Sequence, residues 1–171
     1  MRKILFIVIL LISPALYAQY NFYKIEYYYN PIRLDGGGEF RSYKISLNAE
    51  GKGKIIYTIS YDTSASKAMI HEFDISAETK SEINKTFNNN NIIETENQFK
   101  EEKEFENIKE NEFARVSYTN IVPEGSERPV VVKTMSTPVF PKDEIKERLR
   151  VFYEAVRNAV PKEIWEKIEK K

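Results

Sequence analysis

The sequence contains no cysteine among its 171 residues and a single histidine, His71. The lack of cysteine excludes disulfide bonds, thiolate metal sites, cysteine nucleophiles and a lipidated cysteine. A single imidazole excludes any site that needs two, and no G-x-S-x-G segment is present to carry the nucleophile of a serine hydrolase. The chain must therefore fold by packing alone.

An excess of charge of one sign is also lacking, because Lys+Arg and Asp+Glu each number 26. Nucleic-acid-binding domains usually carry a concentrated positive surface, so this balance argues against nucleic acid as a partner. With 42% hydrophobic and 30% charged residues, the composition is typical of one folded domain. The heavy use of Lys, Ile, Asn, Glu and Tyr is typical of a bacterial protein from an AT-rich genome.

No hydrophobic run approaches the roughly 20 residues that span a bilayer. The longest, residues 4–12, follows a short basic start and precedes a stretch with proline and small residues that ends at Ala18. These three parts predict a secretory signal peptide over residues 1–18, cleaved between Ala18 and Gln19. We therefore expect residues 19–171 to form a single exported domain, periplasmic or extracellular. Retention of the signal segment as a membrane anchor is the alternative.

Hydrophobic and polar residues alternate in short runs separated by turn-forming residues, which is the pattern of half-buried strands. Such runs cover residues 22–29, 43–47, 55–61, 69–75, 113–122 and 130–132. Short turn segments join run 43–47 to run 55–61 and run 113–122 to run 130–132, which predicts two hairpins. They favour a mainly antiparallel sheet of about five or six strands.

Two helical patterns accompany the strands. Ser76 is placed to cap a short helix that the asparagines at 88–91 end. A longer amphipathic pattern carries one apolar stripe: Ile145, Leu149, Phe152, Val156 and Ala159. Pro161 interrupts it and starts a short last helix, in which Trp165 either packs on the body or anchors a partner. The chain is thus predicted to be an α+β domain, with a long C-terminal amphipathic helix and one shorter helix packed on one face of the sheet.

Residues 94–112 contain eight Glu and three Lys and follow no clean hydrophobic period. Such a run is usually a solvated surface segment, so we expect an acidic, flexible excursion from the domain. The acids lack the spacing of a calcium loop, and no metal site is predicted here.

His71 is the one candidate for imidazole chemistry. It shares a strand face with Met69, Phe73 and Ile75, which favours a half-buried packing role. His71-Glu72 begins like a zinc-protease motif, but Ile75 stands where that motif requires a second histidine. We assign no catalytic, cofactor-binding or metal-binding residue. A carboxylate-based hydrolase, with two acids facing each other across a cleft, is the less favoured enzymatic alternative.

Tyrosine is the most unusual component, with eight residues of this type from Tyr20 to Tyr61. Most of them share strand faces with Ile and Leu, as core packing requires. Tyr28 lies on the opposite face of its strand, beside Lys24 and Glu26. It is therefore the best candidate for an exposed contact with a saccharide or another small ligand.

The order of elements resembles a recurring type of uncharacterised secreted bacterial α+β domain. In that type a strand pair leads to a segment like residues 73–78, and a short helix ends near a step such as Ile92-Ile93. A second strand pair and a terminal amphipathic helix complete it. The likeness covers most of residues 40–160 and implies an envelope or extracellular location without implying an activity.

These patterns together predict an exported, non-catalytic domain that binds a protein or a component of the cell envelope. Saccharide or small-ligand binding through the tyrosine-rich sheet is the alternative. No cofactor and no nucleic acid are expected, and membrane contact is expected only if the signal segment is retained.

N-terminal sequencing of the exported protein should begin at or near Gln19, because signal peptidase cleaves after a small residue such as Ala18. Precursor from cells in which export is blocked is the control and should begin at Met1. An exported protein that still begins at Met1 would contradict the assignment of a cleaved leader.

Overall fold

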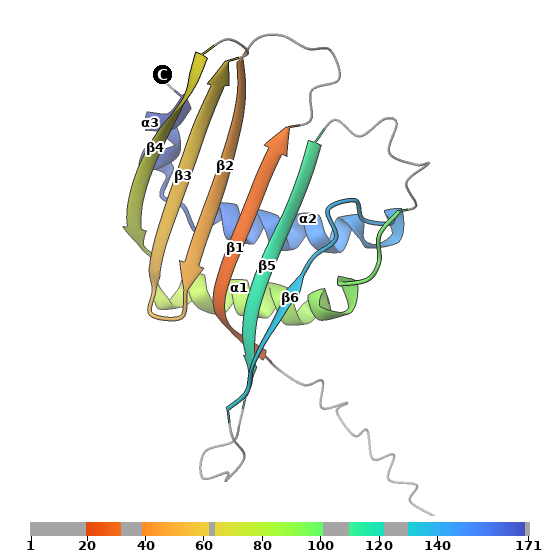
Figure 1. Ribbon diagram of the computed structural model, residues 1–171. Helices are drawn as coiled ribbons and strands as arrows, with labels where there is room; N and C mark the ends of the chain where they lie inside the picture. Colours follow the sequence, from red (N-terminus) through yellow and green to blue (C-terminus); the bar gives the residue numbers. More distant parts are fainter. Residues whose placement is uncertain (1–19, 32–38, 62–63, 101–109, 122–129, 170–171) are drawn as a thin grey trace, which may run out of the picture.

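The computed structural model of the chain describes residues 20–31, 39–61, 64–100, 110–121 and 130–169 (Figure 1). They form a six-stranded sheet in the order β4-β3-β2-β1-β5-β6, with every neighbouring pair antiparallel. The strands are β1 (Tyr20–Pro31), β2 (Glu39–Asn48), β3 (Lys52–Tyr61), β4 (Ser64–Asp74), β5 (Glu110–Asn120) and β6 (Val132–Ser136). The predicted α+β class with an antiparallel sheet is confirmed.

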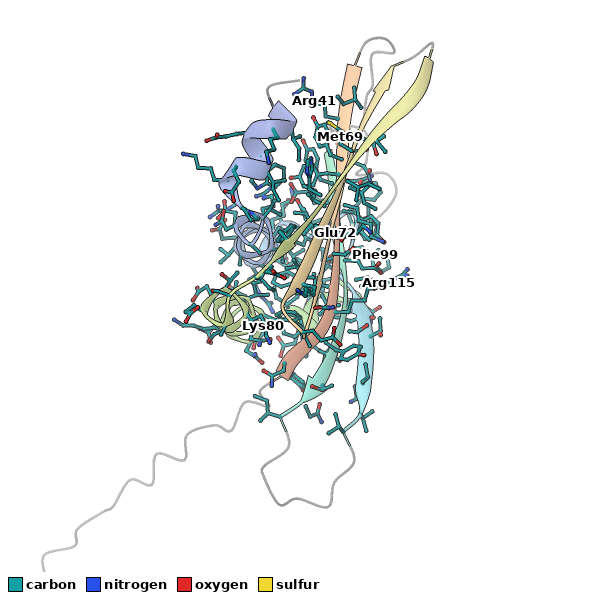
Figure 2. The ribbon with its side chains drawn as sticks, turned by 90° about the vertical axis from the view of Figure 1, so that its left-hand side faces the viewer. Arg41, Met69, Glu72, Lys80, Phe99 and Arg115 are labelled. Carbon is teal, nitrogen blue, oxygen red and sulfur yellow. The ribbon has the colours of Figure 1, made fainter. Side chains whose placement is uncertain are left out.

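Three helices accompany the sheet, and Figures 1 and 2 show all of them on the same side of it. They are α1 (Ala77–Asn89), α2 (Asp143–Asn158) and α3 (Lys162–Glu169), and a 3-10 turn, η1 (Ile92–Thr95), follows α1. The helices α1 and α2 run across the strands, so they are seen end-on in Figure 2. Among the helices of the described residues, none has both the length and the hydrophobicity that a membrane crossing requires.

The expectation of a long C-terminal helix is wrong. The amphipathic stripe ends with α2, which has 16 residues, and the chain continues into the separate eight-residue α3. Pro161 is the physical reason, because it has no N–H for a helical hydrogen bond and its ring disfavours helical conformation in the preceding residue. The end of α2 closes instead through a hydrogen bond from the Val160 N–H to the Arg157 carbonyl, 3.1 Å long.

Side chains of the strands alternate between an inner face, covered by the helices, and an outer face on the opposite side. On the inner face Tyr27, Ile45 and Ile55 lie side by side across three strands and are fully buried. The strand β1 departs from simple alternation at Tyr23, where a β-bulge shifts its register with β5. The bulge turns Phe22 into the core and leaves Tyr23 55% exposed, whereas strict alternation along residues 22–29 would place Tyr23 on the buried face of Ile25 and Tyr27.

The predicted apolar stripe of α2 packs against the inner face. Ile145, Leu149, Phe152 and Val156 are each at most 2% exposed. The Phe152 ring also meets Phe87 of α1, with the two ring centroids 5.7 Å apart. Burying a side chain of this size contributes about 1.5–3 kcal/mol, so this stripe is a major source of stability for a fold without cross-links.

The helix α1 begins and ends where the sequence predicts. The Ser76 Oγ accepts a hydrogen bond from the Thr79 N–H at 3.1 Å, which satisfies one of the free donors of the first turn. Beyond the other end, Asn91 adopts the left-handed conformation with a φ of 46°. Within the helix, Asn84 accepts a hydrogen bond from the Phe22 N–H at 2.9 Å and so ties α1 to the start of β1.

Both ends of the acidic segment 94–112 belong to regular structure. Its first two residues, Glu94 and Thr95, complete η1. Further along the same segment, the Lys100 N–H donates a hydrogen bond to the Phe140 carbonyl at 2.8 Å. Its last residues begin β5. Residues 101–109, the centre of the expected flexible excursion, lie outside the described residues.

Replacing Leu149 with alanine should lower the free energy of unfolding by about 2–5 kcal/mol, because the substitution leaves a cavity between α2 and the sheet. Urea denaturation followed by circular dichroism measures this loss. The matched control is Glu144→Ala in the exposed first turn of the same helix, which should change stability only slightly. A Leu149→Ala loss below about 1 kcal/mol would mean that α2 does not pack as described.

Candidate functional site

The outer face of the sheet is the most distinctive surface of the molecule, because no described element covers it (Figure 2). The strand register places side chains on this face in transverse rows. One row, which we term the apolar row, crosses five strands and consists of four apolar or aromatic side chains and one lysine: Phe113, Tyr28, Lys44, Ile56 and Ile70. Ile70, at its β4 end, is 57% exposed. A solvated sheet face usually carries polar side chains, so this row is unusual.

A second row lies beside the apolar row and is mainly charged. It consists of Arg115, Glu26, Ser46, Lys54 and Glu72, from β5 to β4. Glu26 binds two lysines, Lys44 at 2.7 Å and Lys24 at 3.2 Å. The Lys54 ammonium lies 3.0 Å from the Glu72 carboxylate. The pairs Glu26–Lys44 and Lys54–Glu72 join neighbouring strands and support their register, whereas Lys24 lies on the same strand as Glu26.

A hollow of about 530 Å³ opens next to this charged row, at the end of the sheet where β2 turns into β3. Its lining includes three lysines and two acids, namely Lys24, Lys52, Lys54, Glu72 and Asp74. The Lys52 ammonium lies 2.7 Å from the Asp74 carboxylate. Both acids therefore have a lysine partner, and the hollow presents polar, mixed charge to a ligand.

The charges on the outer face affect one another's ionisation. A hydrogen bond from the Lys44 ammonium is the largest cause that lowers the pKa of Glu26 below its usual value of 4.5. Lys24 adds to this effect, and partial burial opposes it. Glu26 is thus held as a carboxylate between two lysines, which suits a structural anion better than a proton donor.

Tyr28, the predicted contact residue, lies half-buried on this outer face within the apolar row. Its ring stacks on Phe113 with centroids 4.6 Å apart and an interplanar angle of 6°. On the opposite neighbouring strand, the Lys44 ammonium lies over the same ring, 5.0 Å from its centroid. Both faces of the Tyr28 ring are therefore occupied, and the ring offers its edge rather than a flat platform for stacking a sugar.

Most of the other tyrosines face the helices. Tyr27 and Tyr57 are buried, and Tyr43 and Tyr29 stack on each other with centroids 4.9 Å apart. The Trp165 ring meets Tyr43 edge-on at 5.1 Å, so it packs α3 against the sheet. This contact agrees with the first of the two roles considered for the tryptophan.

A polar cluster lies within this aromatic layer, where α2 ends above β1 and β5. Arg157 forms an ion pair with Glu112 at 3.2 Å, and the Tyr153 hydroxyl lies 2.7 Å from the Thr137 hydroxyl. The Tyr27 hydroxyl is fully buried and has no hydrogen-bond partner of ordinary geometry in the described part of the chain. Burial raises the pKa of Tyr27 far above its usual value, so this phenol stays neutral.

His71 lies on the inner face opposite Ile55, half-buried near the β4 edge. Within the described ranges, no group of three or more His, Asp or Glu side chains is arranged to hold a metal ion. Glu72 and Asp74, the acids that line the hollow, come from the same strand and each lies beside a lysine. The facing pair of acids that a glycosidase needs is not formed there. Ala18 and Gln19, the predicted cleavage residues, lie outside the described residues.

Sequence reasoning missed most of the outer-face surface. Phe113, Ile56 and Ile70 were each placed in a predicted strand, but nothing in one strand shows which residues of other strands lie beside it. The signal that could have found them is the alternation itself, because each is apolar on the face opposite to that of its buried neighbours.

The ionisation of Glu26 can be tested by substitution of its main partner. In Lys44→Met the pKa of Glu26, measured by NMR titration, should rise toward 4.5. Because the folded pKa lies below the unfolded value, the pair stabilises the fold above about pH 4.5, and this contribution is lost as the pH falls through the folded pKa. Lys54→Met, which removes the partner of Glu72, is the control and should leave Glu26 unchanged. An unchanged Glu26 pKa in Lys44→Met would refute the pairing.

Comparison with known proteins supplies no functional assignment for this surface. No protein-family model matches the chain, and no curated protein matches it either. The function must therefore be argued from the geometry of the sheet.

Proposed function

We propose that the chain is an exported, non-catalytic domain that binds a protein or a component of the cell envelope through the outer face of its sheet. The observation that carries this proposal is the apolar row, which crosses five strands without a covering helix. Apolar side chains bordered by polar and charged ones are typical of an interaction surface.

The neighbouring charged row supports the proposal. Each of its acids has a lysine partner, Lys44 for Glu26 and Lys54 for Glu72, so they can border a contact without burying an isolated charge. Arg115 has no ion-pair partner among the described residues although it lies opposite Glu26, which leaves its five N–H donors for a bound molecule. The surface thus combines an apolar centre with donors at its border.

The same geometry favours binding over catalysis. The acids of the outer face lie beside lysines, the pKa of Glu26 is lowered by its lysine partners, and the one histidine lies on the opposite face of the sheet. A general acid or base needs a group that exchanges protons near the working pH. Export, which the N-terminal leader pattern predicts, would present this surface to proteins or polymers outside the cytoplasm.

Site-specific photo-crosslinking tests the proposal in the source cells. A photoreactive amino acid at position 56, within the apolar row, should yield a defined cross-linked product. Ile70→Asp in the same chain should abolish that product, because it places an unpaired charge in the contact. Digestion of the product with a protease or with glycan hydrolases then distinguishes a protein from an envelope polymer.

The matched control places the same amino acid at Glu147, which is exposed on α2 on the other side of the molecule. It should not yield that product. Equal products at both positions, or a product that Ile70→Asp leaves intact, would refute binding through the outer face. Because Ile70 is 57% exposed, its substitution should leave the fold intact, which circular dichroism checks.

A further inference from the structure

The strand β6 is an edge of the sheet, and its first half extends beyond the helices (Figure 1). Val130 and Val131, the two residues before β6, and Val132, its first residue, are 66%, 47% and 51% exposed, and Ile121, the residue after β5, is 48% exposed. The exposed positions include side chains of both faces, because successive residues of a strand point to opposite sides. Burial begins only at Met135, which is 2% exposed. This end of the sheet is therefore both apolar and uncovered.

In the first half of β6, the backbone groups that point away from β5 have no partner among the described residues. The Thr137 N–H donates to the Ala114 carbonyl at 2.9 Å, which fixes the alternation of the β5–β6 ladder. In an antiparallel ladder every second residue directs its N–H and C=O to the neighbouring strand. Met135 and Lys133 therefore bond to β5, while the backbone groups of Val132 and Thr134 point away from the sheet. No described element pairs with them.

One end of this free edge is closed. The backbone N–H of Ser136, which also points away from β5, donates to a Glu96 carboxylate oxygen at 3.4 Å. An added strand can therefore pair along residues 130–134 but not beyond. Val132 is the midpoint of this stretch.

We propose that two copies of the chain associate through β6, with the strands antiparallel and a two-fold axis at Val132. The Val132 N–H and C=O of each copy then bond to those of the other, and Val130 pairs with Thr134. Six backbone hydrogen bonds form in this register, and the two sheets become one continuous twelve-stranded sheet.

The side chains fit this register and disfavour a shift of the axis toward Lys133. With the axis at Val132, the outer-face pairs are Val132 with Val132 and Val130 with Thr134, which are the β-branched pairs that strands favour. Lys133 then lies opposite Val131. An axis at Lys133 would set two like charges opposite each other, which destabilises a strand pair. The chain itself thus supplies a complementary partner strand.

The opposite edge, β4, is less suited to such pairing. Its side chains at positions 72 and 74 are acids, and both are exposed. Charged residues on an edge strand discourage pairing with another strand, and β4 exposes these two acids where β6 exposes the single Lys133. Ile70 is nevertheless 57% exposed at the middle of β4, so this edge is the rival that the experiment must distinguish.

Single-cysteine variants make the test direct, because the natural chain has no cysteine. The two Cα atoms of a hydrogen-bonded pair are about 5.5 Å apart, within the range that a disulfide spans. Mild oxidation of Val132→Cys in the mature chain should therefore give a disulfide-linked dimer at low concentration. Ile70→Cys, the matched control on the other edge, should stay mainly monomeric. Preferential linkage of Ile70→Cys would overturn the proposal.

Sedimentation equilibrium of the unmodified mature chain provides the second measurement. It should show a reversible monomer–dimer equilibrium, and Val132→Lys should raise the dissociation constant at least about tenfold by placing two ammonium groups on the axis. Val132→Thr keeps a β-branched side chain and should retain the dimer. A chain that stays monomeric at all concentrations, or a dimer that Val132→Lys does not weaken, would refute pairing through β6. The outer-face contact proposed above is independent of these results, since it involves neither edge strand pairing nor position 132.

Discussion

The packing of α1 and α2 across one face of the sheet is the interaction on which the rest of the structure depends. The chain has no disulfide, so the burial of apolar side chains must offset the conformational entropy of folding. The contact centres on rings: Phe152 meets Phe87 between the helices, and Tyr153 meets Tyr27 of β1 at 5.2 Å. Because the described helices all pack on this face, no described element covers the other face of the sheet.

That asymmetry gives the two faces different physical roles. The inner face needs volume and hydrophobicity, and its polar groups are few and mostly bonded, as in the pair formed by Tyr153 and Thr137. The outer face is held in register by cross-strand ion pairs, which contribute little to stability when they are exposed. Stability alone therefore does not require an apolar row on the outer face, and this is why we relate that row to binding.

The exposure of the β6 edge follows from the same placement of the helices. The helices cover the middle of the sheet, and the residues at the start of β6 extend beyond this cover, so their side chains and backbone groups are exposed together. The outer face and the β6 edge are separate surfaces with different chemistry. The first offers side chains of mixed character, whereas the second offers backbone hydrogen-bond donors and acceptors flanked by valines.

The sequence by itself determined the local elements of this protein. Alternation predicted the strands, Ser76 predicted the start of α1, and the stripe from Ile145 to Val156 predicted the buried side of α2, since each depends only on neighbours within a few residues. Its prediction of a long C-terminal helix failed, since α2 has only 16 residues, although Pro161 and the short helix after it were predicted.

Only the tertiary structure decided which residues of different strands lie together. The stacking of Tyr28 on Phe113 joins residues far apart in the chain and depends on the register between β1 and β5. The bulge at Tyr23 inverted the expected faces of two residues, because a single extra residue in one strand changes which side chains point inward. The surfaces proposed for binding depend on the pairing of whole strands, and no local pattern encodes that pairing.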